Sequence, residues 1–177
     1  MLDLDKYNED ELLAIQTELF RDRISEFTKE VFKIVSPGSR YLHNWHIDCI
    51  AEHLHAIETG ELHRLIVNIQ PRALKSIMIS VAFPAWLLGR KPSTQIINAS
   101  YSQSLSLKMS VDTRLVIESD WYKYLFPQTV IASDQNEKKK FQTTRRGHRL
   151  ATSVGGTLTG DRDWETNIYT NHFQLLT

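Results

Sequence analysis

The stretch from Arg64 to Ser80, RLIVNIQPRALKSIMIS, constrains the fold more than any other part of the sequence. Residues 64–69 form a short, apolar and β-branched run, which is typical of a buried strand. The loop QPRALKS follows, and apolar residues then recur at helical spacing from about Lys75 to Leu88. A strand, a short loop and a helix in this order predict one unit of an α/β fold.

Helical patterns precede this unit. A capping box at Asn8 and Glu11 opens one long amphipathic helix that we expect to run to about Val35. Its apolar stripe is wide enough to dock on its own domain or on another subunit. A second helix fits WHIDCIAEHLHAIETG, with Gly60 as its natural C-terminal cap.

The second half of the chain alternates strand and helix patterns. TQIINAS predicts a second buried strand, SLSLKMSVDTRLVIES predicts a helix, and DWYKYLFP predicts a short helix that ends at Pro127. KFQTTRRGHRLATS predicts a β-hairpin that turns around Arg146 and Gly147. The order of these elements favours a parallel central sheet with helical crossovers.

Composition is that of an ordinary soluble globular protein. The chain has 177 residues and a formal net charge of zero, so no overall positive charge indicates a nucleic-acid partner. Cys49 is the only cysteine, which excludes an intramolecular disulfide and fits a reducing cytoplasm. The acidic N-terminus does not resemble a signal peptide, and no apolar run approaches the length of a membrane span.

The loop after the first apolar run has the outline of a phosphate-binding loop. The full motif, G-x-x-x-x-G-K-[ST], uses glycines to turn backbone N–H groups onto phosphates, a lysine to reach them, and a hydroxyl to bind Mg²⁺. Lys75 and Ser76 fit its last two positions, but Ile69 and Leu74 replace the glycines. The leucine is strained if its position requires a positive φ. From the pattern alone, a plain β–α turn remains the alternative.

Four motifs follow one another between about Tyr41 and Gly160: PR..KS, PAWLLGR.P, ASYS and TSVGG..TG. Together they resemble the ATPase region of large terminase subunits of tailed phages and prophages. The resemblance implies an incomplete P-loop NTPase domain of the ASCE type, with a parallel central sheet, over residues 41–160. It also implies a helical segment over residues 1–40 and a divergent tail over residues 161–177.

The same resemblance implies a function and partners. Large terminase subunits are ATPases and endonucleases that use ATP to package viral DNA into the capsid. We therefore expect ATP and Mg²⁺ as cofactors, and double-stranded DNA, the capsid portal and the small terminase subunit as partners. The full-length family forms homo-oligomers, and the expected location is the cytoplasm of a bacterial host.

Individual residues match the family's nucleotide site. The resemblance assigns the phosphates and Mg²⁺ of ATP to Lys75 and Ser76, and contact with the γ-phosphate to Arg72. Trp45 and His46 fall where the family places an aromatic residue and a glutamine against adenine. The alternatives are a surface salt bridge for Arg72 and packing of a buried aromatic for Trp45. The other loop residues expected to bind ATP are Pro71, Ala73 and Leu74.

The likeness to the family stops after Gly160. Family members continue into an apolar strand that ends in two acidic residues, which serve Mg²⁺ and the attacking water. Asp161, Asp163 and Glu165 are acidic, but no apolar strand precedes them, so a solvated tail is favoured over a displaced metal site. The sequence therefore predicts a truncated prophage remnant without the nuclease domain, with negligible ATP turnover, an exposed strand edge and marginal stability.

Two other classes of protein compete with this interpretation. One is a nucleotide-binding interaction module that does not hydrolyse ATP. The other is a small kinase, which would require an intact glycine loop and a set of lid arginines. Neither kinase feature is present in the sequence.

Two polar groups have both a functional and a structural interpretation. His43, His46, His53 and His55 are close together, but no cysteines or acids complete a zinc set at the usual spacing, so solvated or capping histidines are favoured. The basic stretch from Lys138 to Arg149 predicts either contact with DNA phosphates or a solvated hairpin.

Two small-residue motifs are similarly ambiguous. Residues 100–102 follow the second strand and would lie near the nucleotide, whereas Ser102 alone is a natural cap for the next helix. Gly155, Gly156 and Gly160 match the family loop that leads into the missing strand, although turn geometry alone also explains them.

Overall fold

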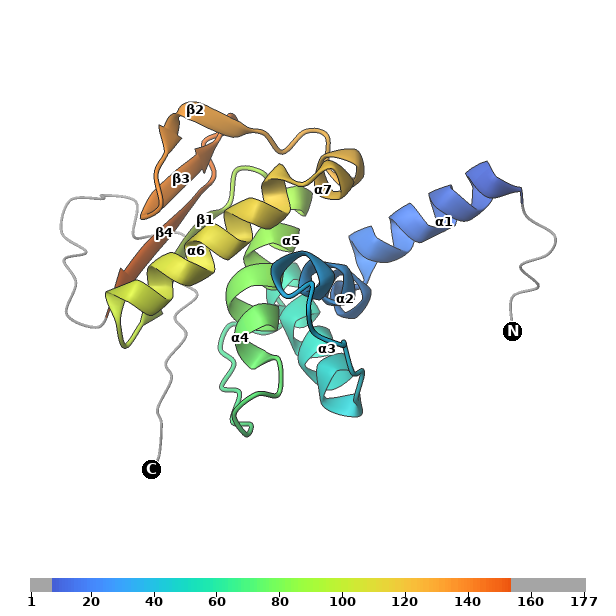
Figure 1. Cartoon of the computed structure of the whole chain (residues 1–177), viewed down its shortest axis with the longest axis horizontal. Coiled ribbons are helices and arrows are strands. Elements are labelled where there is room, and N and C mark those ends of the chain that lie inside the picture. The colour runs from blue at the N-terminus through green and yellow to red at the C-terminus, as the bar shows by residue number, and fades with distance from the viewer. Residues whose placement is uncertain (1–7, 154–177) are drawn as a thin grey trace.

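The computed structural model describes residues 8–153 of the chain. These residues form a mixed α/β structure in which helices pack against a small four-stranded sheet (Figure 1). Helix α1 (Glu9–Asp22) points away from the rest of the molecule, and its N-terminal capping box at Asn8 and Glu11 is confirmed. Within the described residues, no helix combines the length and the apolar character that crossing a bilayer requires.

The sheet is mixed, so the prediction of a parallel central sheet is wrong for most of it. Its order is β1-β4-β3-β2, and only β1 (Gln95–Ser100) and β4 (His148–Ser153) are parallel neighbours. β3 (Lys140–Thr143) pairs antiparallel with β4 and with β2 (Ile131–Asn136). The strand β2 was not predicted from the sequence. The predicted hairpin is confirmed, and its short turn forces the antiparallel pairing because parallel neighbours need a long crossover.

Residues 64–69, the run that was predicted to be a buried strand, do not belong to the sheet. The segment belongs to none of the described helices or strands, and no described strand pairs with it. Exposure alternates along it as in a half-buried strand, with Leu65 and Val67 packed against the core and Ile66 exposed. The prediction is wrong because a strand requires a hydrogen-bonded neighbour, which the apolar sequence alone does not provide.

The single long helix predicted to reach Val35 is two helices. α1 ends at Asp22, α2 covers Ile24–Val35, and Arg23 between them has extended backbone (φ −111°, ψ 105°). The break frees the carbonyl oxygen of Arg21, which accepts hydrogen bonds from Trp86 Nε1 and Arg90 Nη1, both at 2.9 Å. Tertiary donors therefore replace the intrahelical bond that a continuous helix would have made.

The helix after the loop begins at Lys75, as predicted, and contains a π-helical turn. It consists of α4 (Lys75–Ile77), the π-helical η2 (Met78–Ala82) and α5 (Phe83–Arg90). Pro84 has no N–H group, so the Ser80 carbonyl lacks the usual donor four residues later. Thr113 Oγ1 donates to that carbonyl instead, at 3.4 Å.

The remaining helices agree with the sequence. α3 (Trp45–Thr59) ends at Gly60, whose φ of 83° is the left-handed conformation expected of a glycine cap. α6 (Gln103–Glu118) and α7 (Asp120–Leu125) follow β1. The core lies where α2, α3, η2, α5, α6 and α7 meet, and its largest fully buried apolar side chains include Trp86, Tyr122 and Phe27.

Candidate functional site

The loop from Gln70 to Leu74 has strained backbone at two positions. Arg72 and Leu74 have φ values of 65° and 61°, and Leu74 is the residue directly before the helix. This conformation costs a side-chain-bearing residue about 1–2 kcal/mol, so the strain foreseen for Leu74 is present. Left-handed residues that alternate with ordinary ones build the anion-binding concavities called nests. Strain that is concentrated in one short loop points to a function for that loop.

The side chain of Leu74 helps to hold the strained loop in place. It is partly buried and packs against the hydrophobic core, while Pro71 and Arg72 are exposed and Ala73 is partly buried. A leucine therefore supplies packing energy at a position where a glycine would supply only conformational freedom. The substitution for the motif's glycine is thus compatible with the loop geometry that the glycine normally allows.

Lys75 and Ser76 occupy the first turn of the helix and are partly buried. Backbone N–H groups at a helix start have no intrahelical acceptor, and the helix dipole favours negative charge there. A lysine ammonium at the same place adds a full positive charge, and the serine hydroxyl adds a donor and an acceptor. The first turn and the loop before it therefore offer groups that suit a phosphate.

A cavity of about 240 Å³ adjoins residues 65–69, which lead into the loop. It is lined by α3 on one side and by the segment on the other, through Trp45, His46, Cys49, Ile50, His53 and residues 65–69. Trp45 is 75% exposed, so the alternative in which it is a buried packing residue is wrong. Nε2 of His46 is buried and has no hydrogen-bond partner among the described residues. The cavity therefore offers an exposed aromatic ring to a ligand, whereas the His46 nitrogen has no exposed surface for one.

Other sequence predictions have mixed outcomes. Ser102 caps α6 by accepting a hydrogen bond from the Leu105 N–H at 3.3 Å, which confirms its structural interpretation. His43 Nε2 lies 2.7 Å from Asp48 Oδ2. Arg72 forms no ion pair with any residue in the described part of the chain. Predictions that lie outside the described residues concern Gly155, Gly156, Gly160, Asp161, Asp163 and Glu165.

Arg149 in β4 is fully buried, which the sequence did not reveal. It belongs to the basic stretch considered for DNA contact, but a side chain without exposed surface cannot reach a phosphate. Its Nη2 donates to the Ser80 carbonyl at 3.1 Å, while Nε and Nη1 have no partner within the described residues. Burial lowers the pKa of Arg149 to about 9, and the charge of Asp112 opposes this shift. The arginine ties the helix after the loop to the sheet.

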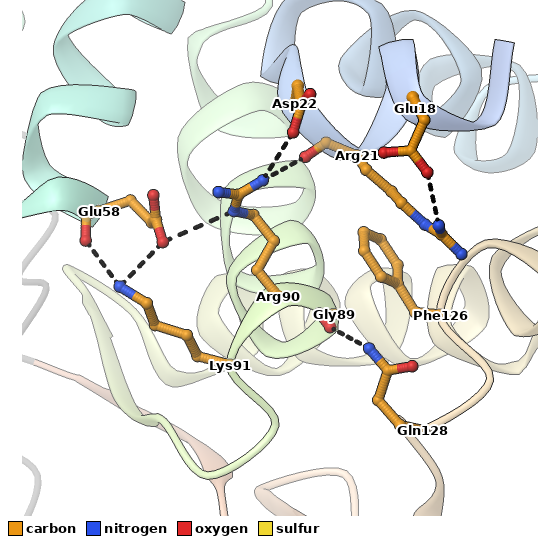
Figure 2. A pocket seen from close by; sticks show the side chains of 9 residues that line it. All are labelled: Glu18, Arg21, Asp22, Glu58, Gly89, Arg90, Lys91, Phe126 and Gln128. Carbon is orange, nitrogen blue, oxygen red and sulfur yellow. Dashed lines mark hydrogen bonds and ion pairs between the residues drawn. The ribbon is translucent and has the colours of Figure 1, made fainter. Parts of the chain in front are cut away.

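A second cavity, of about 400 Å³, lies between α1, α3 and the end of α5 (Figure 2). Arg90 lies there between Asp22 and Glu58, with its guanidinium carbon 4.8 Å from the centre of the Trp86 ring. Lys91 Nζ lies 2.9 Å from Glu58 Oε1 and donates to the Glu58 carbonyl at 2.9 Å. Because its charges neutralise one another, this cavity is a structural junction rather than an anion site.

Burial by itself would raise the pKa of the Glu58 carboxyl. The hydrogen bond from Lys91 and the positive charges of Arg90, Lys91 and His55 outweigh burial and hold the pKa below its ordinary value. The ionised carboxylate is therefore the form that the folded chain favours.

The structure thus brings Trp45 and His46 beside the residues that lead into the loop, and it places Lys75 and Ser76 directly after that loop. Comparisons with family models, with curated proteins and with solved structures gave no match for this chain. Interpretation of the site therefore depends on its own residues and geometry.

Proposed function

We propose that this chain is the nucleotide-binding N-terminal ATPase portion of a large terminase subunit of a tailed phage or prophage. The observation that carries the proposal is the loop ending at Leu74. It has two left-handed residues that are not glycines, and it leads directly into a helix that begins with Lys75 and Ser76. Strained backbone of this kind is expected where a loop is shaped to hold an anion.

In this proposal, backbone N–H groups of the loop and the Lys75 ammonium hold the phosphates of ATP. The Ser76 hydroxyl would be a ligand of the accompanying Mg²⁺, which supplies positive charge to the phosphate oxygens when bound. Arg72 is exposed at the loop and carries a charge suited to the terminal phosphate. The exposure of Arg72 supports its role, because its side chain must extend to the terminal phosphate. The partial burial of Lys75 supports its role, because its ammonium must be held in position beside the phosphates.

The base would lie in the cavity beside α3. Trp45 presents an exposed ring there, and His46 lines the same cavity. Stacking on an aromatic side chain is worth about 1–3 kcal/mol per base. The P-loop NTPase fold and the family partners, which are double-stranded DNA, the portal and the small terminase subunit, belong to the same proposal.

The proposal is tested by titrating MgATP and MgADP into the chain by calorimetry. The Lys75→Ala variant should bind roughly 10- to 100-fold more weakly, because it loses a charge-assisted hydrogen bond to phosphate. Lys108→Ala is the matched control, since Lys108 is an exposed lysine that pairs with Asp112 on α6. Absence of nucleotide binding, or equal binding by all three proteins, would refute the proposal.

A second titration examines the base. Trp45→Leu should weaken nucleotide binding by roughly tenfold through the lost stacking. Tyr124→Leu removes another exposed aromatic ring, on α7, and should leave binding unchanged. Phosphate release measured on the same samples separates an ATPase from the alternative, a module that binds nucleotide without turnover.

A further inference from the structure

Two large apolar side chains are exposed on the two walls of the cavity beside α3. Trp45, from α3, is 75% exposed, and Ile66, from residues 65–69 on the other side, is 94% exposed. Leu65 and Val67, the neighbours of Ile66, instead pack against the core. Each wall therefore presents an exposed large apolar side chain. Exposed apolar groups in a concave site mark a place where a ligand binds.

A flat ring held between these two side chains would be covered on both of its faces. The indole ring of Trp45 suits one face of a nucleobase, because bases stack well on aromatic side chains. The aliphatic side chain of Ile66 suits the other face, because contact with the ring removes apolar surface from water. A purine has a larger ring system than a pyrimidine, so a purine gains more from both contacts.

The polar groups that line the cavity suit adenine and guanine alike. Asn68 is exposed, and its amide can exchange donor and acceptor by turning over. His53 Nδ1 lies 2.7 Å from the Cys49 carbonyl oxygen, which can only accept, so the neutral ring leaves Nε2 as an acceptor. Adenine and guanine both carry an amino group that can donate to it. No partner within the described residues binds His46 Nε2 and fixes the tautomer of that ring.

Strong discrimination between two bases arises when the wrong base leaves a buried polar group of the site without a partner. In this cavity the side chains of Asn68 and His53 are exposed, so water can replace a missing contact with the base. The cost of exchanging one purine for the other is therefore small. Stacking, which every base offers, supplies most of the affinity for the ring.

We propose that Trp45 and Ile66 clamp the base of a purine nucleotide by stacking, and that this clamp accepts adenine and guanine with similar affinity. The inference rests on the proposed nucleotide site, and it defines the substrate class of that site as purine nucleoside triphosphates rather than ATP alone. It also gives a binding role to Ile66, which the sequence assigned to a buried strand.

Calorimetric titration of four ligands tests the selectivity of the clamp. The ligands are MgATP, MgGTP, MgCTP and magnesium tripolyphosphate. The dissociation constants of MgATP and MgGTP should agree within roughly threefold. MgCTP should bind roughly three- to tenfold more weakly than MgATP, because its single ring covers less apolar surface. Tripolyphosphate carries no base, so it should bind most weakly of the four.

Substitutions at the two walls test the clamp itself. Ile66→Ala should weaken MgATP and MgGTP binding by the same factor, roughly three- to tenfold, and should leave tripolyphosphate binding unchanged. Trp45→Leu should likewise affect both purine nucleotides equally. Both side chains are exposed, so neither substitution should unfold the chain. Leu115→Ala, at an exposed leucine on α6, is the control and should leave the binding of every ligand unchanged.

The only cysteine of the chain reports whether the base occupies the cavity. Cys49 is exposed and lines the cavity, so an alkylating reagent reaches its thiol in the free protein. Saturating MgATP and saturating MgGTP should slow its alkylation to a similar extent. Saturating tripolyphosphate should not slow it, because no base covers the thiol.

Three results would overturn this inference and leave the proposed nucleotide site in place. They are an affinity for MgATP more than about tenfold above that for MgGTP, nucleotide binding that Ile66→Ala leaves intact, and nucleotide binding that does not protect Cys49. Tripolyphosphate that binds as tightly as MgATP would overturn the clamp but still support a phosphate-binding loop. Failure of all four ligands to bind would overturn the proposed function together with this inference.

Discussion

Two six-residue segments of this chain have similar sequences and different structures. RLIVNI at residues 64–69 and QIINAS at residues 95–100 are both short, contain consecutive β-branched residues and are followed by a loop and a helix. The second is β1, which pairs residue by residue with β4, from Gln95 opposite His148 to Ser100 opposite Ser153. The first pairs with no strand among residues 8–153.

The difference lies in what packs around each segment. Ile96, Asn98 and Ser100 in β1 are buried, and the carbonyl of Asn98 accepts a hydrogen bond from Ser106 of α6 at 2.9 Å. In the unpaired segment only one face is covered, and Ile66 on the other face is almost fully exposed. Apolar, β-branched sequence therefore favours extended backbone, but a strand forms only where another segment supplies its hydrogen bonds.

The largest expected effect compares one isoleucine from each segment. Ile96→Ala should destabilise the chain by about 2–5 kcal/mol, because it leaves a cavity in the core. Ile66→Ala should change stability by less than about 0.5 kcal/mol. Urea unfolding measures both changes in stability. Similar losses for the two variants would mean that residues 64–69 are buried in solution.

The next effect concerns the turn that positions β1. A Cβ atom on Gly147 would collide with the Pro92 carbonyl oxygen and lie 2.8 Å from that of Thr94, directly before β1. Gly147→Ala should therefore cost roughly 1–3 kcal/mol through overpacking. Gly38→Ala is the control, since nothing lies within 4 Å of its added carbon. Equal thermal unfolding temperatures for the two variants would contradict the close packing of turn and strand.

A smaller effect compares strained residues in the two regions. Arg72 in the loop and Arg146 in the β3–β4 turn are both exposed, with φ values of 65° and 67°. Glycine at either position should stabilise the chain by about 0.5–1 kcal/mol, since relief of strain exceeds the added entropy of the unfolded state. Arg72→Gly should weaken MgATP binding, whereas Arg146→Gly should not. Weaker MgATP binding by both variants would show that the loss of binding does not arise from the loop that contains Arg72.

The smallest effect concerns the pH dependence of the charged cluster of Glu58, Arg90 and Lys91. Glu58 lies shortly before residues 64–69, and its partners Arg90 and Lys91 lie shortly before β1. Because the pKa of Glu58 is lowered in the folded chain, its ionised form stabilises the fold above the ordinary pKa of 4.5. That contribution is lost as the pH falls through the lower, folded pKa.

Thermal unfolding between pH 3 and pH 7 measures this contribution. Glu58→Gln should lower the melting temperature at pH 7 and flatten its decline in acid. We expect a modest shift, because Lys91 is about half exposed and water screens its charge. If the melting temperature of Glu58→Gln falls in acid as steeply as that of the parent chain, the pH dependence comes from other carboxylates. Asp120→Asn, at a fully exposed carboxylate on α7, is the control.

Features decided by near neighbours in the chain were predictable. The capping box at Asn8, the glycine cap at Gly60 and the hairpin turn at Arg146 each depend on residues only a few positions apart. The strain at Leu74 was also foreseeable, because the requirement for a positive φ belongs to the loop motif itself.

Features decided by remote partners were not predictable. The break at Arg23 depends on Trp86 and Arg90, which supply donors to the Arg21 carbonyl from far along the chain. The burial of Arg149 depends on the Ser80 carbonyl that Pro84 leaves without its usual donor. A basic residue in a basic stretch gives no local sign of such a partner.

The sequence by itself therefore determined the caps at Asn8 and Gly60, the hairpin turn at Arg146 and the strain at Leu74. Those properties depend on backbone conformation over a few residues. The strand at Gln95–Ser100 was predicted, but only the tertiary structure decided that residues 64–69 join no described strand. A strand pair, a buried side chain or a buried polar contact requires atoms from distant parts of the chain. Local conformational preference does not determine which distant residues become neighbours.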